Sequence, residues 1–394
     1  MKFVVAGYGT RGDVEPCIAV AGELLRRGHD VQMAVTVPPD MLAFTTSAGL
    51  VSVPFGRDWQ ALLADGDFVR TLEDPLRYLF QAVNFVNQTC SEKTTVLMSV
   101  TEGADLLVAG MTEQQIVANV ADYYGVPLAA LHFYPPELRE TASPGGSSAA
   151  THPVLAHRRA LGLPEEAGSS ARPLEIQAYD ALCSPLRAAE WAHGDGRRPF
   201  VGALTLELPT DADDEVLSWI ASGRPPVYFG FGSTPLAAPG DMVALTSAAC
   251  ALLGERALIH VGPNDFSDIS HPDHVKFVGA VNNASIFPGC AAVVHHGGAG
   301  TTAAALRAGT PQLILWGGID QPFWAATVRY LEVGVGRYFP ATVLDSLVDD
   351  LRLILTAQHA SRAREVATQM TKAAESLSQT ADLLEEAARQ GHEV

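Results

Sequence analysis

At 394 residues, the chain is too long for one ordinary hydrophobic core and is expected to fold as two domains. With 47% hydrophobic and 18% charged residues, it has the composition of a well-packed globular protein and not of a disordered one. The formal net charge of −18 argues against nucleic acid as the main partner, because a phosphate backbone requires a basic surface.

The cysteines and the N-terminus indicate a reduced, cytoplasmic protein. The 5 cysteines are odd in number and scattered, without a Cys-x-x-Cys pair. Residues 1–9 are typical of a first strand and not of a signal peptide. No uncharged apolar run reaches the length of a membrane-spanning helix, whereas peripheral contact with a membrane remains compatible with the sequence.

The first half alternates strands with helices, which predicts a parallel sheet with right-handed crossovers. Residues 135–170 are rich in Pro, Gly, Ser and Ala, and they form either a loop over a binding site or a plain connection. The expected strands are 2–6, 31–35, 51–53, 106–109, 128–131, 181–184 and 200–202, and the expected helices are 15–27, 38–49, 75–100, 113–124 and 155–161.

A domain boundary is expected at residues 206–225, where Pro and Asp gather, and the alternation then resumes. Ligands of parallel sheets bind at the carboxyl ends of the strands, so both halves would offer loops to a cleft between them. The expected strands are 227–231, 257–261, 274–278, 291–294 and 312–315, and the helices are 241–253, 301–308 and 323–331, with helices filling most of the rest.

The stretch at 295–302, His-His-Gly-Gly-Ala-Gly-Thr-Thr, carries the clearest chemical signal. It lies between a short apolar run and a helical pattern, so its glycines would let a ligand approach the backbone, and the new helix would offer unpaired N–H groups to a phosphate. His296 could add a hydrogen bond or a positive charge, and Thr301 a hydroxyl. The alternative is that the glycines only form a tight turn and the histidines are satisfied locally.

The first loop matches Gly-x-Gly-x-x-Gly at residues 7–12, the pattern of a nicotinamide-dependent oxidoreductase. That alternative is disfavoured because the second strand ends at Thr36 without the acidic residue that would bind ribose. Asp13, directly after this loop, would either cap the first helix or act as a general base toward a hydroxyl. Arg11 could tune Asp13 or contact the donor of a transferred group.

Two further polar loops follow strands of the second half. Ser233 could bind a phosphate or cap a helix, and Asp320 with Gln321 could bind the vicinal hydroxyls of a sugar or cap the helix that Pro322 begins. Together with the turn at 295–302, these loops suit a nucleotide-sugar, and its acceptor would enter near Asp13.

Two Asp-x-Asp pairs, at 65–67 and 211–213, are weak candidates for a metal site because they fall in a loop and in the expected linker. No bound metal is therefore expected.

Four ordered motifs resemble those of the GT-B glycosyltransferases of family 1. They are GTRGDVEP at 9–16, VYFGFGS at 227–233, HHGGAGTT at 295–302 and DQPFWA at 320–325. Within that family the chain looks most like bacterial natural-product transferases of the glycopeptide antibiotic type, sterol-glucosyltransferase-like proteins and actinobacterial glycolipid transferases.

The resemblance implies an α/β protein with the GT-B fold. It has two Rossmann-like domains, 1–205 for the acceptor and 226–373 for the nucleotide-sugar, whose parallel sheets face across a cleft. Residues 206–225 would link them, and a C-terminal helix at 374–394 would cross back to the N-terminal domain. The implied activity is inverting, metal-independent transfer of a hexose or deoxyhexose from a UDP- or dTDP-sugar, without a cofactor, to a hydroxyl of a hydrophobic natural product, glycopeptide or lipid.

The resemblance also assigns site residues. Asp13 would be the general base, although many family members carry a His in this loop. The backbone of Val281 would meet the pyrimidine, and Asp320 and Gln321 would hold the sugar. The donor would be bound by Arg11, Gly12, Ser233, Val281, His296, Gly298, Gly300, Thr301, Asp320 and Gln321. We expect a monomer or a weak homodimer, and the remaining alternative is a non-catalytic protein that binds nucleotide-sugars.

Overall fold

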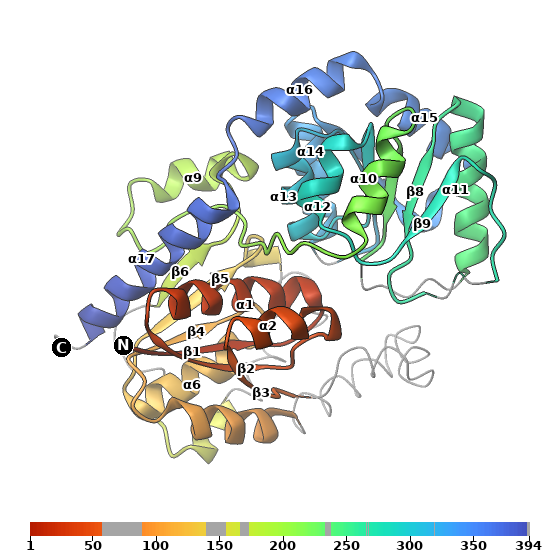
Figure 1. Ribbon diagram of the computed structural model, residues 1–394. Helices are drawn as coiled ribbons and strands as arrows, with labels where there is room; N and C mark the ends of the chain where they lie inside the picture. The colour runs from red at the N-terminus through yellow and green to blue at the C-terminus, as the bar shows by residue number, and fades with distance from the viewer. Residues whose placement is uncertain are drawn as a thin grey trace. The chain divides into compact units, whose positions relative to one another are not determined.

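The computed structural model describes residues 1–56, 89–138, 155–165, 173–232, 238–264, 266, 268–318 and 320–391 (Figure 1). The chain divides into two compact units. The first comprises Met1–Leu206 together with Ala373–Val394, and the second comprises Glu207–Lys372.

The first unit contains a sheet of six parallel strands in the order β3-β2-β1-β4-β5-β6. The strands are β1 (Lys2–Gly7), β2 (Asp30–Val35), β3 (Val51–Val53), β4 (Leu106–Ala109), β5 (Leu128–His132) and β6 (Leu174–Gln177). The helices are α1 (Arg11–Arg26), α2 (Leu42–Ser47), α6 (Gln114–Tyr124), α9 (Pro185–Trp191) and α17 (Ala373–Gly391), with 3₁₀ turns η1 (Pro39–Met41) and η2 (Ala181–Cys183) and further helices at 89–101 and 155–160.

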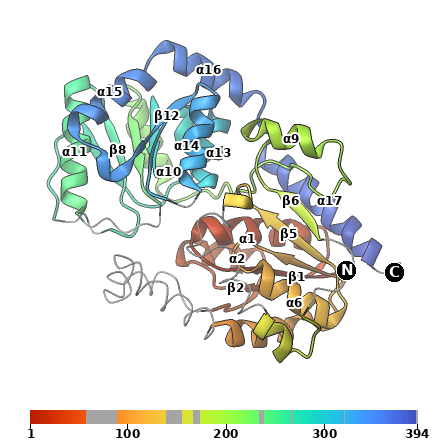
Figure 2. The same cartoon turned by 180° about the vertical axis from the view of Figure 1, so that it is seen from behind.

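Helices cover both faces of this sheet (Figure 2). On one face, Val4 and Ala6 of β1 share a core with Val117 of α6 and with the helix at 89–101. On the other face, α1 packs on β1 and β2, and α17 packs on α1 and β4. Arg27, the C-cap residue of α1, donates to Asp382 on α17 at 2.6 Å. The last helix of the chain therefore belongs to the first unit.

The second unit contains a sheet of six parallel strands in the order β12-β11-β10-β7-β8-β9. The strands are β7 (Val227–Gly230), β8 (Ala257–His260), β9 (Val275–Val278), β10 (Ala292–His295), β11 (Gln312–Trp316) and β12 (Gly334–Tyr338). The helices are α10 (Asp213–Ala221), α11 (Pro239–Leu253), α12 (Asn283–Ile286), α13 (Ala299–Ala308), α14 (Gln321–Tyr330), α15 (Leu344–Ile354) and α16 (Ala357–Ala367), with 3₁₀ turns η3 (Phe287–Gly289) and η4 (Phe339–Ala341).

Successive side chains of β7 and β10 point to opposite faces of the sheet, and each face has its own hydrophobic core. Phe229 faces α11 and α15, whereas Tyr228 and Val293 face α10, α12 and α13. Because all the strands run parallel, their carboxyl ends lie at one edge of the sheet. The loops after β7, β10 and β11 therefore begin side by side, since β10 lies between β7 and β11.

The predicted α/β class with two parallel sheets is confirmed, but four expected elements were wrong. Residues 181–183 form the 3₁₀ turn η2 instead of a strand, and Ser184 then connects η2 to Pro185, the first residue of α9. The sheet ends with β6 instead, and of residues 200–202 only Phe200 pairs, as an isolated bridge to Gln177. The expected linker contains α10.

The fourth error concerns β12, which lies where only helices were expected. Its sequence, Gly-Val-Gly-Arg-Tyr, hides the strand because two glycines interrupt the apolar pattern. Both are imposed by packing. A Cβ on Gly334 would lie 2.0 Å from the Gln312 carbonyl oxygen, and one on Gly336 would lie 2.4 Å from the Ala325 Cβ.

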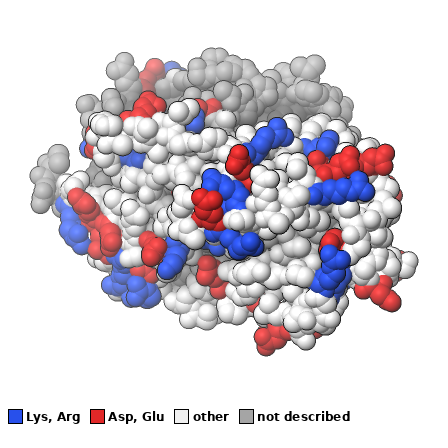
Figure 3. Space-filling model, turned by 90° about the horizontal axis from the view of Figure 1, so that it is seen from above, with Lys and Arg blue, Asp and Glu red and all other residues white. Residues whose placement is uncertain are grey.

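Most of the cysteines are buried, and the charges on the described surface are mixed. All 5 cysteines are free thiols, and 4 of them are buried. On the described part of the face in Figure 3, acidic and basic side chains lie in mixed groups without a continuous basic surface. Among the residues that the structure describes, no helix is both long and apolar enough to span a bilayer.

Candidate functional site

The glycine turn (residues 296–298) joins β10 to α13 at the centre of the second sheet. Gly297 has a φ of +94°, which L-residues with a side chain rarely adopt. A Cβ there would also lie 2.7 Å from the Ile314 Cγ2 and 3.2 Å from the Gln321 Cβ. The turn is therefore packed against β11 and the start of α14, which brings two of the predicted motifs together.

The N-terminus of α13 has no side-chain cap. Gly298 is its N-cap residue, and the first turn carries no acidic residue. In the described part of the chain, no residue accepts a hydrogen bond from the N–H groups of Ala299, Gly300 or Thr301. These groups and the positive end of the helix dipole form a site suited to an anion. The helix begins two residues earlier than expected, so Gly300 and Thr301 lie in its first turn.

His296 lies beside this N-terminus with its imidazole between two glycines. A Cβ on Gly298 would lie 2.7 Å from its Nε2, and a Cβ on Gly232 would lie 2.6 Å from its Cε1. Its Nδ1 is buried and has no hydrogen-bond partner among the described residues. Loss of solvation lowers the pKa of His296 to about 4, so the imidazole is neutral at pH 7.

The loop that follows β11 carries the second polar group. Asp320 precedes α14, and its Oδ2 accepts a hydrogen bond from the Trp324 indole at 3.0 Å. The Gln321 Oε1 accepts from the Gly317 N–H at 2.7 Å and from the Gly318 N–H at 3.3 Å. Both side chains thus fix this loop, although neither caps the N–H groups of α14 as the helix-cap alternative expected. Both lie at the same sheet edge as the glycine turn.

Val281 lies in the loop after β9, the strand at the opposite side of the sheet from β12. Its side chain packs against the core that α10, α12 and α13 share. The neighbouring Asn282 N–H donates to Asp213 at 2.9 Å, and Asp213 also accepts from the Thr210 hydroxyl at 2.7 Å. Asp213 is therefore occupied in holding the chain at the start of α10.

In the first unit, α1 begins at Arg11, four residues earlier than expected. The reason is a capping arrangement, in which the Asp13 Oδ2 accepts from the Thr10 N–H at 2.8 Å and from the Thr10 hydroxyl at 2.9 Å. Asp13 thus lies in the first helical turn and not before it. Gly9, with a φ of +134°, leaves room for this carboxylate, because a Cβ there would lie within 3 Å of it.

Arg11 and Gly12 share the first turn of α1. The Arg11 Nε donates to Glu15 at 2.9 Å, and the other oxygen of Glu15 accepts from the Leu206 N–H at 2.9 Å. Gly12 is exposed, and a Cβ there would meet only the Thr10 Oγ1, at 3.7 Å. The packing of the chain itself does not require a glycine at this position.

Lys93 and Glu113 form a buried ion pair behind the first loop, at 2.7 Å. The Lys93 ammonium lies 3.5 Å from the centre of the Tyr8 ring, and the Thr112 hydroxyl donates to the Tyr8 carbonyl at 2.6 Å. This group anchors the loop that leads to Asp13. No sequence pattern indicates this pair, because its members are 20 residues apart and match no motif.

Several predicted residues lie outside the described ranges. They are Ser233, the Asp65–Asp67 pair, most of the expected helix at 75–100, and residues 139–154 and 166–172 of the Pro- and Gly-rich segment. Among the described residues, no cluster of three or more His, Cys, Asp or Glu side chains could hold a metal ion.

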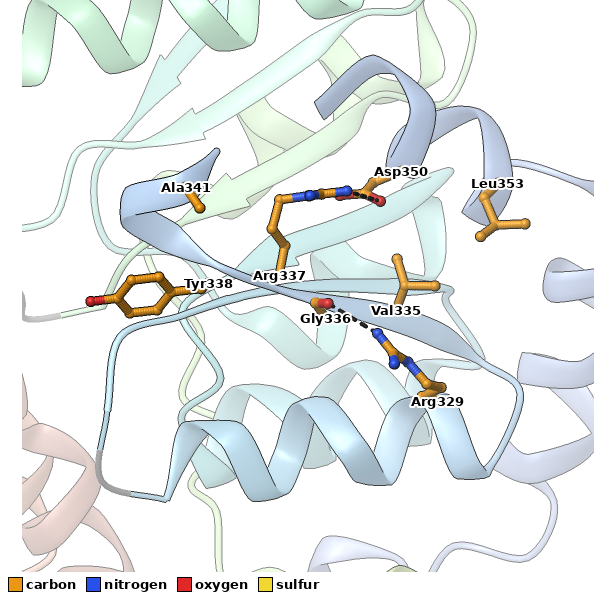
Figure 4. Close-up of a pocket in the computed structure, with 8 residues that line it drawn as sticks. All are labelled: Arg329, Val335, Gly336, Arg337, Tyr338, Ala341, Asp350 and Leu353. Atoms are coloured by element: carbon orange, nitrogen blue, oxygen red, sulfur yellow. Dashed lines mark hydrogen bonds and ion pairs between the residues drawn. The ribbon is translucent and has the colours of Figure 1, made fainter. Parts of the chain in front are cut away.

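A hollow of about 630 Å³ lies beside β12, and none of the predicted site residues lines it (Figure 4). Within it, Arg337 pairs with Asp350 at 3.0 Å, and Arg329 donates to the Gly336 carbonyl at 3.2 Å. Its arginines are thus bonded within the protein, and it is separate from the glycine turn.

Two family models match the chain. Residues 3–103 match the glycosyltransferase family 28 N-terminal domain, and residues 245–386 match the C-terminal domain of erythromycin biosynthesis protein CIII-like proteins. These ranges include α1 with Asp13 in the first unit and the glycine turn with α14 in the second.

Relatives cover nearly the whole chain. An uncharacterized glycosyltransferase of Mycobacterium tuberculosis is 52% identical over 99% of each chain. The vancomycin aglycone glucosyltransferase of Amycolatopsis orientalis is 31% identical over 93% of each chain. The crystal structure of the glycosyltransferase VinC in complex with dTDP superposes with a TM-score of 0.67 at 20% identity, covering 99% of this chain and 100% of the other. The chain is therefore a member of the GT-B glycosyltransferases.

Proposed function

We propose that the protein is an inverting, metal-independent glycosyltransferase. It moves a hexose or deoxyhexose from a UDP- or dTDP-sugar to a hydroxyl of a hydrophobic natural product, glycopeptide or lipid. The observation that carries the proposal is the uncapped N-terminus of α13, with its unpaired N–H groups and the neutral His296 beside it. This N-terminus would provide a local anion site on a chain whose net charge is −18.

The diphosphate of the donor would lie at this N-terminus. The N–H groups of Gly300 and Thr301 would bind its oxygens, Gly298 would allow its close approach, and the imidazole of His296 would donate a hydrogen bond. Charge develops on the diphosphate as the glycosidic bond breaks, so donors held in place before reaction stabilise the transition state. The dTDP named with VinC and the glucosyl transfer named for the vancomycin relative support a nucleotide-sugar donor.

The sugar would be held by the loop after β11. Because the Gln321 oxygen already accepts two backbone N–H groups, only its amide N–H groups would be directed at a sugar oxygen. Asp320 would accept from a sugar hydroxyl while keeping its bond to Trp324. Val281, at the end of β9, would contact the pyrimidine through its backbone, and Ser233 would assist at the phosphates.

Asp13 would remove the proton of the acceptor hydroxyl as that oxygen attacks the anomeric carbon and the diphosphate departs. Its bonds to Thr10 hold the carboxylate in place at the start of α1, which satisfies the positional demand on a general base. Arg11 and Gly12, in the same turn, would contact the donor. The proton ends on Asp13 and the negative charge on the released nucleotide.

The proposal is tested first by the donor. A thermal-shift panel of UDP- and dTDP-sugars should give a stabilising donor, and transfer to a set of hydrophobic acceptors is then followed by mass spectrometry. The anomeric coupling constant of the product reports inversion, and activity in EDTA should equal activity in added Mg²⁺. A chain that binds no nucleoside diphosphate, or a product that retains the anomeric configuration, contradicts the proposal.

Asp13 is tested by Asp13→Asn, which keeps an oxygen able to accept from Thr10. General-base catalysis contributes roughly 10²–10⁴-fold, so kcat should fall by about that factor while the thermal midpoint and the Kd of the nucleotide stay near wild type. A near-normal kcat would assign Asp13 to helix capping alone.

A further inference from the structure

His295, the last residue of β10, is buried directly behind the glycine turn. Its side chain has no solvent exposure, and the same holds for Gln312 on β11 and Thr302 on α13. Three polar side chains at full burial require defined partners, because each unpaired group would lose its hydration without compensation.

The hydrogen bonds around His295 determine its tautomer. The Gly297 N–H donates to the His295 Nδ1 at 3.1 Å, so that nitrogen must carry a lone pair. The proton is then on Nε2, which donates to the Gln312 Oε1 at 3.0 Å. The amide nitrogen of Gln312 in turn faces the Thr302 carbonyl at 3.4 Å. Each assignment fixes the next one in this chain of bonds.

This chain of bonds links the three parts that form the anion site. It joins His295, which precedes the glycine turn, to Gly297 within that turn and to Thr302 in α13. Thr302 also bonds back to the N-cap, because its hydroxyl donates to the Gly298 carbonyl at 2.9 Å. With the Gly297 N–H directed inward to His295, the N–H groups that remain for a ligand are those of the following helical residues.

The protonation state of His295 matters to this arrangement. Burial, with the neighbouring His296 second, lowers the pKa of His295 to about 3. A protonated ring would place an N–H against the Gly297 N–H and break the first bond of the chain. The neutral form is therefore the one compatible with the turn.

We propose that His295 and Gln312 are positioning residues that hold the glycine turn and the start of α13 in the geometry that receives the donor diphosphate. This proposal rests on the proposed function, because it places the diphosphate at α13. His295 does not itself contact the ligand, so its role differs from that of His296, although the two are adjacent in sequence.

The test compares Gln312→Met, which removes both bonds at similar volume, with Gln312→Glu, which retains the acceptor for the His295 Nε2–H. Thr310→Val is the matched control. Thr310 is also buried, lies two residues before Gln312 and just ahead of β11, and donates to the Phe287 carbonyl at 2.9 Å. Nucleotide Kd is measured by calorimetry with UDP and dTDP, and thermal midpoints are measured in parallel.

We expect Gln312→Met to raise the nucleotide Kd and the donor KM about tenfold, with the acceptor KM unchanged. Gln312→Glu should recover most of that loss, because burial keeps its carboxyl neutral, with one oxygen accepting from the His295 Nε2–H and the O–H facing the Thr302 carbonyl. Thr310→Val should lower the thermal midpoint by a comparable amount while keeping the nucleotide Kd within about twofold of wild type. Equal weakening of nucleotide binding in Gln312→Met and Thr310→Val would show that the pair only stabilises the fold and would overturn the proposal.

A second measurement does not depend on whether the Gln312 variants fold. Two-bond ¹H–¹⁵N spectra of histidine-labelled protein, with His295 assigned by loss of its signal in His295→Asn, report the tautomer directly. We expect the Nε2–H form, without titration from pH 5 to 8. An Nδ1–H form or an imidazolium overturns the proposal even if nucleotide binds. If wild type binds no UDP or dTDP, the proposed function fails, whatever the spectra show.

Discussion

Gly298→Ala tests the placement of the His296 imidazole. The backbone of Gly298, with φ −65° and ψ 142°, suits any L-residue, so alanine adds no backbone strain. The new Cβ would lie 2.7 Å from the His296 Nε2, whereas ordinary contact begins at 3.4 Å. The ring must therefore move by about 0.7 Å, the difference between those two distances.

The ring has little room for that movement. On its other side lies Gly232, whose own Cβ, if present, would be 2.6 Å from the His296 Cε1. Overpacking of this kind costs about 1–3 kcal/mol. The reduced freedom of the unfolded chain offsets about 0.4–1 kcal/mol of it. We expect a net loss of about 1–2 kcal/mol in unfolding free energy, measured by urea denaturation.

The effect on binding should exceed the effect on stability. A displaced imidazole would lose its proposed contact with the diphosphate, and a hydrogen bond to a charged group contributes about 1.5–3 kcal/mol. The Kd for UDP or dTDP should therefore rise by about 10- to 100-fold in calorimetry. Gly240→Ala is the control, because a Cβ on Gly240 would have no neighbour within 4 Å.

A double-mutant cycle decides between displacement of the ring and a general disturbance of α13. In a His296→Ala background the ring is absent, so Gly298→Ala should cost little further binding. The reasoning is refuted if Gly298→Ala binds nucleotide within twofold of wild type, or if its cost is the same in both backgrounds.

Three other predictions follow from the same contacts. Gly12→Ala should raise the unfolding free energy by about 0.5–1 kcal/mol, because the new Cβ meets only one ordinary contact. The same variant should lower kcat/KM if Gly12 lies at the ligand. An equal or higher kcat/KM would show that Gly12 is not part of the ligand site. Glu113→Gln should destabilise the fold by about 3–5 kcal/mol in urea titrations by leaving the Lys93 charge buried without its partner. The double variant with Lys93→Met should recover part of that loss, and no recovery would contradict the pairing argument. The folded pKa of His295 lies near 3, below the ordinary value of about 6.5, so the unfolded chain binds more protons at this residue between these values. The contribution of His295 to stability should be constant above pH 6.5 and fall by up to about 1.4 kcal/mol per pH unit below it, and His296, with a folded pKa of about 4, adds a similar slope down to that pH. His295→Asn should therefore reduce the measured slope, and an unchanged slope would contradict this account.

The central strands of the sheets could be predicted from the sequence because they are buried on both faces. Such strands are continuous apolar runs, and the bounds expected for 106–109 match β4, whose residues are all buried. The bounds expected for 51–53 also match β3, although that edge strand is partly exposed. The order of the polar loops along the chain was also sufficient to place the glycine turn and the Asp320 loop at one edge. β12 was missed because its glycines are required by close packing against Gln312 and Ala325. These contacts come from other parts of the chain, so no local sequence pattern indicates them.

The roles of the two adjacent histidines could not be distinguished from sequence. The alternation of side chains along a strand predicts only that the two histidines face opposite ways. It does not identify the partner of His295, because that partner is Gln312, 17 residues further along the chain. The fold decides that His295 is buried against β11 and that His296 lies against the glycines. The start of α1 was misplaced for a similar reason, since Thr10 and Asp13 form their cap only once the turn at Gly9 is in place.

The two units contain the same local arrangement, a strand, a glycine turn and a helix, with opposite electrostatic results. At α1 the Thr10 N–H is bound by the Asp13 carboxylate, so an approaching phosphate would meet a negative charge. At α13 the first turn carries no acid and its N–H groups have no described acceptor. The position of Asp13 therefore disfavours a dinucleotide pyrophosphate at the Gly-x-Gly-x-x-Gly loop. The carboxylate that closes α1 to phosphate is the same group that is proposed to accept a proton from the acceptor.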